Sequence, residues 1–402
     1  MKKRGLSIFF ENFLKKESIF KSKDYLQSNY FPETILHREE EIEHIAGILA
    51  PTLRMEKPSN LFIYGKTGTG KTLVIKHIKD HLMRIAKEKE LNINIIYLNC
   101  KLKRTADTEY RLIAQIAREF GKEIPSTGLP TDEVYRLFID CLKKKKQIVI
   151  LILDEVDQLV KKIGDEVLYN LTRLSTEIKN VEISLVGISN NMLFVDNLDP
   201  RVKSSLSEEE ILFNPYNALQ LQDILRQRAK QAFKKEVIGE GLIEKCAAFA
   251  ARDHGDARRA LELLRVAAEL AERKNEIKVV IEHLDLAEEK IERDKIVDIV
   301  KSQPKQFQLA LYSILLASSK NETQIFTGEI YELYKKYCSK IGLRPLTQRR
   351  ISDIIAELEI LGVINAKVIS KGRYGRTREI SLAIPFSTKP EIESILKEGL
   401  GV

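Results

Sequence analysis

The stretch Gly65-Lys66-Thr67-Gly68-Thr69-Gly70-Lys71-Thr72 decides the fold of this chain. It fits the pattern G-x-x-x-x-G-K-[ST], and it stands between a short apolar run at residues 60–64 and an apolar stretch at 73–78 that continues as a helix. A strand, a glycine-rich loop and a helix start in this order form a phosphate cradle, because glycine lets the backbone wrap closely around an anion and the N–H groups of a helix start attract it. We expect Lys71 to reach the β- and γ-phosphates of a nucleotide and the Thr72 hydroxyl to hold Mg²⁺. An ordinary turn rich in glycine and threonine is the alternative, but it does not account for both flanks.

Length and composition limit the class of protein. A chain of 402 residues is too long for one ordinary core, so two or three domains are expected. The four cysteines lie far apart and form no C-x-x-C pair, which indicates neither zinc nor a disulfide framework and suits a reducing, cytoplasmic location. The net charge of +8 permits nucleic acid as a partner.

The membrane classes find little support in the sequence. No apolar run approaches the roughly 20 residues that cross a bilayer. The start, residues 1–4, is basic like that of a signal peptide, but Glu11 breaks the short apolar stretch behind it, so we expect no export. A basic amphipathic anchor at residues 6–16 stays open as an alternative.

Apolar runs that alternate with helical patterns organise the first half of the chain. The runs at residues 94–100, 147–153 and 183–188 predict strands, and the second is apolar enough to be buried on both faces. This pattern favours an α/β core with a parallel sheet and ligand groups at the strand ends. Residues 1–35 are expected to form an arm that lies against this first domain. The predicted helices of the core are at residues 36–49, 108–120, 131–142 and 166–178.

Two further domains are predicted behind the α/β core. After about Phe213 the pattern is helical only, with helices expected at residues 219–233, 241–252, 257–274 and 281–299. A break at residues 302–304 precedes a third unit. We therefore predict a nucleotide-binding base with its arm at 1–212, a helical lid at 213–300 and a C-terminal domain at 301–402.

Polar side chains follow two of the predicted strands. Asp154 stands where a carboxylate would bind Mg²⁺ directly or through water, and Glu155 could polarise an attacking water. Asn190, after the next strand, could orient the same water or touch the γ-phosphate. The alternatives are that the carboxylates only end a strand and that Asn190 belongs to an ordinary turn.

Two arginines and one histidine pair are further candidates for a site. Arg201 could project toward the nucleotide of a neighbouring molecule, or it could be a solvated residue at a helix start. Arg258 could reach across a domain cleft and couple nucleotide to domain angle, or it could form a surface salt bridge. His77 and His81 have the i, i+4 spacing of metal ligands, but no third ligand is evident and we expect no metal there.

The last hundred residues have the pattern of a winged helix. Three predicted helices, the third at 347–361 with Thr347 as its N-cap, precede two strands at 363–370 and 378–384. This order places the third helix in the major groove of DNA and the loop between the strands in a neighbouring groove. Residues 335–378 hold eleven Lys and Arg against three Asp and Glu, so positive charge gathers where phosphate would lie. A winged helix used for protein contact is the alternative. The DNA-contacting residues that we predict are Arg349, Arg350, Lys371, Arg373, Tyr374 and Arg376.

These motifs together resemble the archaeal replication-initiator family of AAA+ ATPases, relatives of the eukaryotic origin-recognition and helicase-loading proteins. The resemblance covers essentially the whole chain, and the residues that carry it are 65–72, 153–157, 187–190, 198–206 and 255–258, with further matches at 32–41 and 216–228. It implies an α/β P-loop AAA+ core, an all-helical lid and a C-terminal winged-helix domain. It also implies sensor roles for Asn190 and Arg258, an arginine finger at Arg201, nucleotide contacts from Tyr216 and Arg228, and a DNA-touching insert within about residues 101–130.

The expected function follows from this resemblance. It implies a switch driven by ATP or ADP with Mg²⁺, which binds origin duplex DNA, acts with other initiator subunits and helps load the replicative helicase. Hydrolysis is expected to be slow, so the chain would be only a weak ATPase. Two alternatives stay open, because fold does not determine function: a clamp-loader-like machine that acts on protein rings, and a DNA-binding regulator of initiation.

Overall fold

The computed structural model describes residues 17–101, 107–125, 128–143, 146–178, 180–206, 208–320, 325–370, 376–385 and 388–402. The chain divides into two compact units, Met1–Leu284 and Asp285–Val402. The predicted base and residues 213–284 of the predicted lid fall within the first unit, whereas residues 285–300 of that lid fall within the second. The predicted division into three domains stays a prediction, and each compact unit is described by itself.

A parallel sheet forms the centre of the first unit. Its strand order is β2-β3-β4-β1-β5, and every neighbouring pair is parallel. Every residue of β1 and β3 is buried, which explains their unbroken apolar sequences. The strands are β1 (Asn60–Gly65), β2 (Ile93–Asn99), β3 (Gln147–Asp154), β4 (Val181–Ser189) and β5 (Glu208–Phe213).

Sequence analysis missed the edge strand β5. Its first half is three glutamates, Glu208 to Glu210, and only Ile211 and Phe213 are buried. A half-exposed edge strand needs no continuous apolar run, so the pattern that revealed the central strands was absent here.

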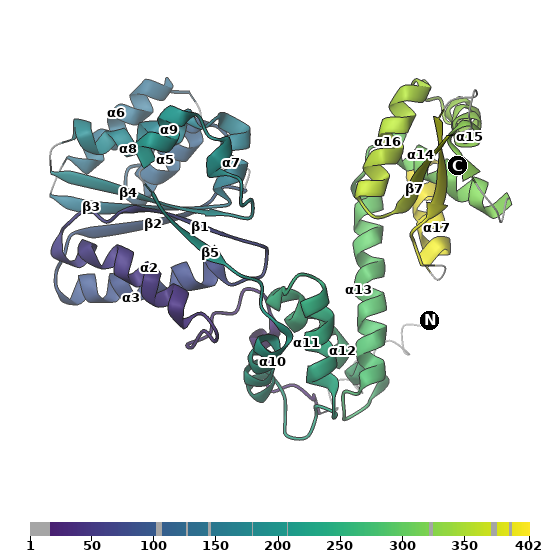
Figure 1. The fold of residues 1–402 in the computed structure, drawn as a ribbon, viewed down its shortest axis with the longest axis horizontal. Helices are drawn as coiled ribbons and strands as arrows, with labels where there is room; N and C mark the ends of the chain where they lie inside the picture. Colours follow the sequence, from purple (N-terminus) through teal and green to yellow (C-terminus); the bar gives the residue numbers. More distant parts are fainter. Residues whose placement is uncertain are drawn as a thin grey trace, which may run out of the picture. The chain divides into compact units, whose positions relative to one another are not determined.

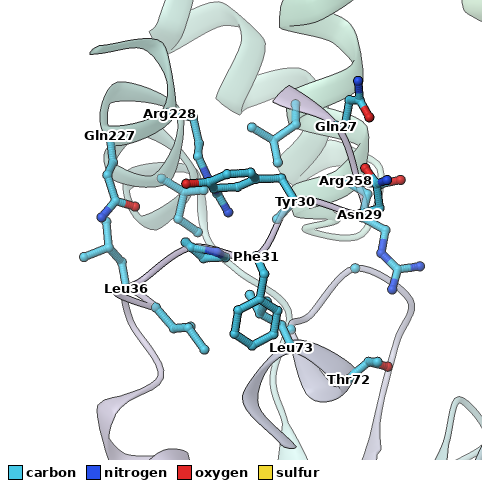
Figure 2. A pocket seen from close by; sticks show the side chains of 18 of the residues that line it. Gln27, Asn29, Tyr30, Phe31, Leu36, Thr72, Leu73, Gln227, Arg228 and Arg258 are labelled. Atoms are coloured by element: carbon cyan, nitrogen blue, oxygen red, sulfur yellow. The ribbon is translucent and has the colours of Figure 1, made fainter. Parts of the chain in front are cut away.

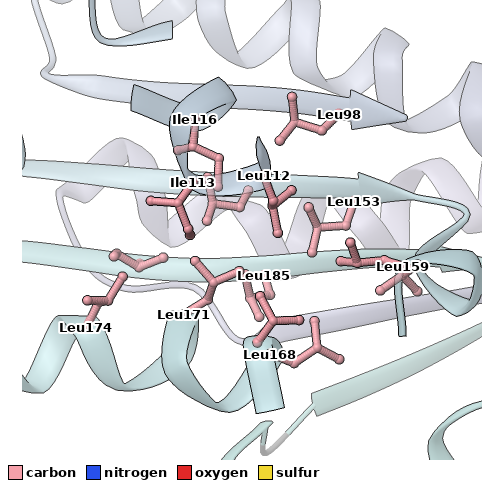
Figure 3. Close-up of a cluster of buried hydrophobic side chains, with 14 of the residues drawn as sticks. Leu98, Leu112, Ile113, Ile116, Leu153, Leu159, Leu168, Leu171, Leu174 and Leu185 are labelled. Atoms are coloured by element: carbon pink, nitrogen blue, oxygen red, sulfur yellow. The ribbon is translucent and has the colours of Figure 1, made fainter. Parts of the chain in front are cut away.

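Helices cover both faces of the sheet (Figure 1). The cluster of buried side chains on one face joins β2, β3 and β4 to helices that include α5 and α8 (Figure 3). A second buried cluster joins the opposite face to α2 and α3. One face carries α5 (Glu109–Glu119), α6 (Thr131–Leu142), α7 (Val156–Ile163), α8 (Glu166–Glu177) and α9 (Pro200–Leu206), and the other carries α2 (Glu39–Leu49) and α3 (Lys71–Glu88). The helix α7, directly after the Asp154-Glu155 pair, was not predicted.

The helical part of the first unit matches its prediction to within a few residues. Local capping explains the starts of two helices. The Asn217 side chain and Gln220 form a capping box on α10, and the Asp256 side chain accepts from the backbone N–H groups of Arg258 and Arg259 at the start of α12. The helices are α10 (Ala218–Ala232), α11 (Leu242–Arg252), α12 (Ala257–Lys274) and α13 (Ile281–Ser302), the last of which crosses into the second unit.

Over residues 17–26 the arm does not lie against the α/β core, so this part of the prediction was wrong. Farther along the arm the prediction is confirmed, because the ring of Phe31 stacks 6.3 Å from that of His77 and Ile35 belongs to the buried cluster of α2 and α3. Its short 3₁₀ helix, Asp24–Leu26, contacts α10 and α12 of the helical part. The ring of Phe20 lies 5.0 Å from that of Phe233, and Lys23 Nζ lies 3.0 Å from Glu272 Oε2. Phe20 and Leu26 are buried where the arm meets the helical part, which the sequence of the arm alone does not reveal.

The second unit is a winged helix, as predicted. Three helices precede the antiparallel pair β7–β8, and a two-residue strand, β6, extends the sheet to the order β6-β8-β7. The predicted inward residues Ile351, Ile354, Ile355 and Leu358 are buried. The elements are α14 (Lys305–Lys320), β6 (Ile325–Phe326), α15 (Thr327–Lys340), α16 (Gln348–Ile360), β7 (Ile364–Ser370), β8 (Arg376–Leu382) and α17 (Lys389–Leu400).

Sequence analysis missed α17, although its signal was present. Ile392, Leu396 and Leu400 recur every four residues behind a proline and are buried, and the helix contacts α14.

Among the described residues, no helix has the length and apolarity needed to cross a membrane.

Candidate functional site

The glycine-rich loop holds Lys71 in a buried position. The Lys71 Nζ donates hydrogen bonds to the backbone oxygens of Gly65 and Lys66, at 2.7 and 2.8 Å, and to Asn190 Oδ1 at 2.9 Å. Burial lowers the pKa of Lys71 to about 8. The lysine thus lies between the loop and the end of β4, beside the asparagine that was predicted to orient a water or touch the γ-phosphate.

Asp154 lies at the end of β3 and faces the start of α3. The Thr72 hydroxyl donates to Asp154 Oδ2 at 2.9 Å, and the hydroxyl of Tyr97, from β2, donates to the same oxygen at 2.6 Å. A hydroxyl and a carboxylate are oxygen donors of the kind that Mg²⁺ prefers. Thr72 and Asp154 therefore fit the predicted cation, which they would hold together. Tyr97 was not predicted.

Glu155 follows in an unusual conformation. Its φ of 57° is in the left-handed region, which a non-glycine residue seldom adopts. Its carboxylate lies 3.7 Å from Lys101 Nζ, at the beginning of the predicted DNA-touching insert. The strained backbone turns the chain sharply between β3 and α7.

One cavity of about 300 Å³ collects most of the predicted catalytic residues. It is bounded by the glycine-rich loop, the ends of β2, β3 and β4, and the start of α12. Its lining includes Lys71, Thr72, Asp154, Glu155, Asn190 and Arg258. Parallel strands explain this gathering, because their carboxyl ends meet at one edge of the sheet.

Arg201 is the predicted catalytic residue that does not line this cavity. Its side chain is 85% exposed and pairs with Asp199, with 3.1 Å between Nε and Oδ1. The exposure leaves the guanidinium on the surface of the unit. A role toward a second molecule stays a prediction.

A second cavity, of about 260 Å³, shares Gly68, Gly70, Thr72 and Arg258 with the first. The arm residues 27–32 and 34–36 form one wall and α10 forms another (Figure 2). Both predicted nucleotide contacts, Tyr216 and Arg228, line it. The two cavities together offer adjoining space for a base and its phosphates.

Arg228 is buried in this wall without full hydrogen bonding. Its guanidinium carbon lies 4.6 Å from the centre of the Tyr30 ring, which Figure 2 shows beside it. The Nε and Nη1 atoms are buried and have no hydrogen-bond partner, and burial lowers the pKa of the side chain. A buried donor without an acceptor is costly, so an acceptor on a ligand in this cavity would offset that cost.

The helical part touches the glycine-rich loop directly. The Ala257 N–H donates to Gly68 O at 3.2 Å. A Cβ added at Gly68, whose φ is +75°, would lie 1.7 Å from Asp256 Oδ1. Gly68 therefore provides room for the loop before α12, which brings Arg258 to the cavity of about 300 Å³.

Arg38 is a buried connection that sequence analysis missed. Its Nε donates to Thr69 O at 3.0 Å, and its Nη2 donates to Asn214 O at 2.6 Å. Its Nη1 donates to Glu41 Oε1 at 2.7 Å, and the guanidinium lies 4.0 Å from the centre of the Tyr216 ring. One side chain thus joins the glycine-rich loop to the segment that leads into α10. An arginine beside three glutamates gave no signal of burial.

In the second unit, α16 presents part of the predicted DNA-binding surface. The Thr347 side chain accepts from the Arg350 N–H and caps the helix, as predicted. Arg349 is exposed, whereas Arg350 pairs with Asp353 and Glu357 at 3.7 and 3.5 Å. Lys371, Arg373 and Tyr374 lie outside the described residues. Of Arg376, the backbone is described, as the first residue of β8.

The fold and the site together define the class. A phosphate loop, a parallel sheet with an acidic strand end, a helical lid and a C-terminal winged helix are the parts of an AAA+ ATPase fused to a winged-helix domain. Three family models match in the same order: "AAA domain" at residues 54–191, "Cdc6 AAA+ ATPase-type lid domain" at 222–289 and "CDC6, C terminal winged helix domain" at 298–388. The chain belongs to the archaeal family of ORC1-type DNA replication proteins.

The similarity to this family extends over almost the full length. The chain is 50% identical over 394 residues to ORC1-type DNA replication protein 1 of Methanosarcina acetivorans, which covers 98% of this chain and 94% of the relative. It is 50% identical over 396 residues to the ORC1-type DNA replication protein of Pyrococcus furiosus, with 98% and 93% covered. Among solved structures, it resembles the Aeropyrum pernix ORC1 protein in complex with DNA, at 44% identity and a TM-score of 0.83, with 95% of this chain and 98% of the other covered. The family resemblance drawn from the motifs is confirmed.

Proposed function

We propose that this chain is a replication initiator that binds ATP or ADP with Mg²⁺ in its first unit and origin duplex DNA with its winged helix. The observation that carries the nucleotide part is the gathering of Lys71, Asp154, Asn190 and Arg258 around one cavity that adjoins the cavity beside Arg228. Family membership supports the replication part.

The residues that line the cavity of about 300 Å³ suit a switch controlled by the bound nucleotide. Lys71 would neutralise charge on the β- and γ-phosphates, and Thr72 with Asp154 would hold Mg²⁺, which supplies further neutralisation of the phosphates. Arg258 enters the same cavity from the helical part, so the occupant of the site would set the position of that part. Asn190 and Glu155 are placed to orient a water.

We propose that hydrolysis is slow. Glu155 can act as a base only when its carboxylate is free to accept a proton. Lys101 engages that carboxylate at 3.7 Å, and Arg201 faces solvent rather than this cavity. Both features favour turnover that waits for a second event, such as contact with another initiator subunit that would receive Arg201.

DNA binding rests on charge and on a relative. The winged helix exposes Arg349 on α16, and residues 335–378 of this unit hold eleven Lys and Arg against three Asp and Glu. The A. pernix relative was solved in complex with DNA, and we extend that property to this chain. Helping to load the replicative helicase is part of the same proposal.

Nucleotide binding is tested by titrating fluorescent ADP with Mg²⁺. We expect Lys71→Ala to weaken binding more than tenfold, because a buried charge-assisted contact is lost. Lys87→Ala, in the last turn of the same helix and exposed, is the matched control and should bind like the unaltered protein. Equal affinity for Lys71→Ala and the control would contradict the proposed site.

DNA binding is tested on duplexes from the origin regions of the host, with ADP and with ATP. We expect Arg349→Ala and Arg373→Ala to weaken binding and to reduce the slope of log affinity against log salt by about one each. Arg226→Ala removes the same charge from a residue paired with Glu244 in the first unit and serves as control. Unchanged binding in both winged-helix variants would refute the assignment of that surface. Vigorous ATP turnover with no preference for DNA would favour the clamp-loader-like alternative instead.

A further inference from the structure

Tyr97 holds the acidic residue of the proposed cation site in place. It lies on β2, and its hydroxyl donates a hydrogen bond of 2.6 Å to Asp154 Oδ2. The Thr72 hydroxyl donates to that same oxygen at 2.9 Å. Nothing in the sequence motifs or in the proposed function assigns a role to Tyr97.

The pairing of the strands places Tyr97 on the correct face. Tyr97 pairs with Ile152 of β3, and Asn99 pairs with Asp154. Side chains two residues apart on a strand share a face, so Tyr97 and Asp154 lie diagonally on one side of the sheet. A residue at position 96 or 98 would point to the opposite face and could not reach the carboxylate.

The ring of Tyr97 is held from one side. Lys76 Nζ, on α3, lies 4.4 Å from the centre of the ring. The tyrosine is thus a fixed partner of the Asp154 carboxylate.

We propose that Tyr97 is a positioning residue for Mg²⁺, which it serves by holding the Asp154 carboxylate against rotation. Two hydrogen bonds on Oδ2 orient the carboxylate toward Thr72, and the cation would meet an arranged pair of oxygen ligands. Groups that orient the ligands of a metal in this way commonly contribute about ten- to a hundredfold to metal affinity. This inference rests on the proposed nucleotide site.

The test compares Tyr97→Phe with a matched variant. Tyr64→Phe also removes one hydroxyl from a strand of the same sheet, β1, but the Tyr64 hydroxyl is buried and has no hydrogen-bond partner. Fluorescent ADP is titrated in EDTA and then with increasing Mg²⁺. We expect Tyr97→Phe to need about ten times more Mg²⁺ for half-maximal tightening, with unchanged affinity in EDTA. Tyr64→Phe should match the unaltered protein in both titrations.

A second readout follows the cation itself. Mn²⁺ bound with ADP is counted by electron paramagnetic resonance, and Tyr97→Phe should release Mn²⁺ at concentrations that saturate the unaltered protein. An unchanged cation requirement in Tyr97→Phe overturns the inference while the nucleotide site stands. Weaker ADP binding in EDTA also overturns it, because the tyrosine would then support the fold of the site and not the cation. If the unaltered protein binds no ADP under either condition, the proposed function fails as well.

Discussion

Lys71 and Arg228 are buried cations of the same unit with opposite surroundings. Lys71 donates to three oxygens, whereas Arg228 leaves two of its nitrogen atoms without an acceptor. A hydrogen-bonded charge tolerates burial far better than an unpaired one. The two residues are therefore expected to respond differently to pH and to substitution.

For Lys71, we predict that nucleotide affinity falls as the pH rises through about 8. Burial lowers the pKa of this lysine from 10.5 to about 8, so the free protein loses the proton above that pH, and bound phosphate must restore it. Binding at pH 9 should take up close to one proton. Calorimetry of ADP binding in buffers with different ionisation enthalpies, at pH 7 and pH 9, measures this uptake. Proton uptake that is the same at both pH values would contradict the prediction.

The lowered pKa of Lys71 also makes the free energy of unfolding depend on pH. Folding disfavours the charged form of Lys71, so this residue opposes folding fully below about pH 8. The cost disappears as the pH rises from about 8 toward the unfolded value of 10.5. Within that window, the contribution of Lys71 to the free energy of unfolding becomes more favourable with rising pH.

For Arg228, we predict that Arg228→Met stabilises the fold and weakens nucleotide binding. Replacing a buried, incompletely paired charge by an apolar side chain of similar length is expected to raise the free energy of unfolding by about 1–3 kcal/mol without nucleotide. ADP affinity should fall at least tenfold, because the donor that faces the cavity is lost. Thermal unfolding and ADP titration check the two parts. Arg226→Met, on the same helix but exposed, should change neither, and a loss of stability in Arg228→Met would refute the argument.

At the scale of elements, the decisive contact joins the glycine-rich loop to the start of α12. The loop has room for Asp256 only because residue 68 lacks a Cβ. Since Asp256 caps α12 and Arg258 follows directly, the position of the whole helix start depends on this contact. The helical part is therefore connected to the glycine-rich loop at the backbone of Gly68.

We predict that Gly68→Ala disrupts the contact between the glycine-rich loop and the start of α12. Nucleotide binding should weaken more than tenfold. The new methyl group would need the space of the Asp256 carboxylate, 1.7 Å away, so this carboxylate must shift and its cap on α12 is lost. Gly121→Ala is the control, because Gly121 has nearly the same φ, +77°, and open space around it. That variant should carry only the backbone strain of about 1–2 kcal/mol and keep normal affinity. Equal affinities of the two variants would show that the contact is unimportant.

At the scale of the whole molecule, the chain consists of two compact units joined within α13. All proposed nucleotide contacts belong to Met1–Leu284, and the winged helix belongs to Asp285–Val402. A ligand stabilises the part that binds it. Nucleotide should therefore stabilise the first unit against unfolding and leave the second unit unchanged.

Calorimetry of the full chain should show two unfolding transitions. We predict that Mg²⁺ with ADP raises the temperature of only one of them. At a hundred times the dissociation constant, the ligand should add about 2.7 kcal/mol to the unit that contains the site. The transition of the winged-helix unit should stay at its original temperature. Lys71→Ala, which should bind poorly, provides the control. A single transition that moves as a whole would show that the units unfold together.

The sequence by itself determined the class of fold, the order of most elements and most residues of the proposed nucleotide site. The phosphate loop, the buried strand that ends in Asp154 and the lid helices are local patterns, and each is legible in a few neighbouring residues. The carboxyl ends of parallel strands meet at one edge, so the order of motifs along the chain is enough to place Lys71, Asp154 and Asn190 together.

Only the tertiary structure decided which side chains support that site. Tyr97 reaches Asp154 because β2 lies beside β3 in one register, and Arg38 reaches Thr69 and Asn214 across 31 and 176 positions of sequence. The edge strand β5 and the helices that bury the arm are likewise set by partners distant in sequence. Local patterns record periodicity and turn chemistry, whereas a hydrogen bond between distant segments depends on how the whole chain packs, and no short stretch of sequence contains that information.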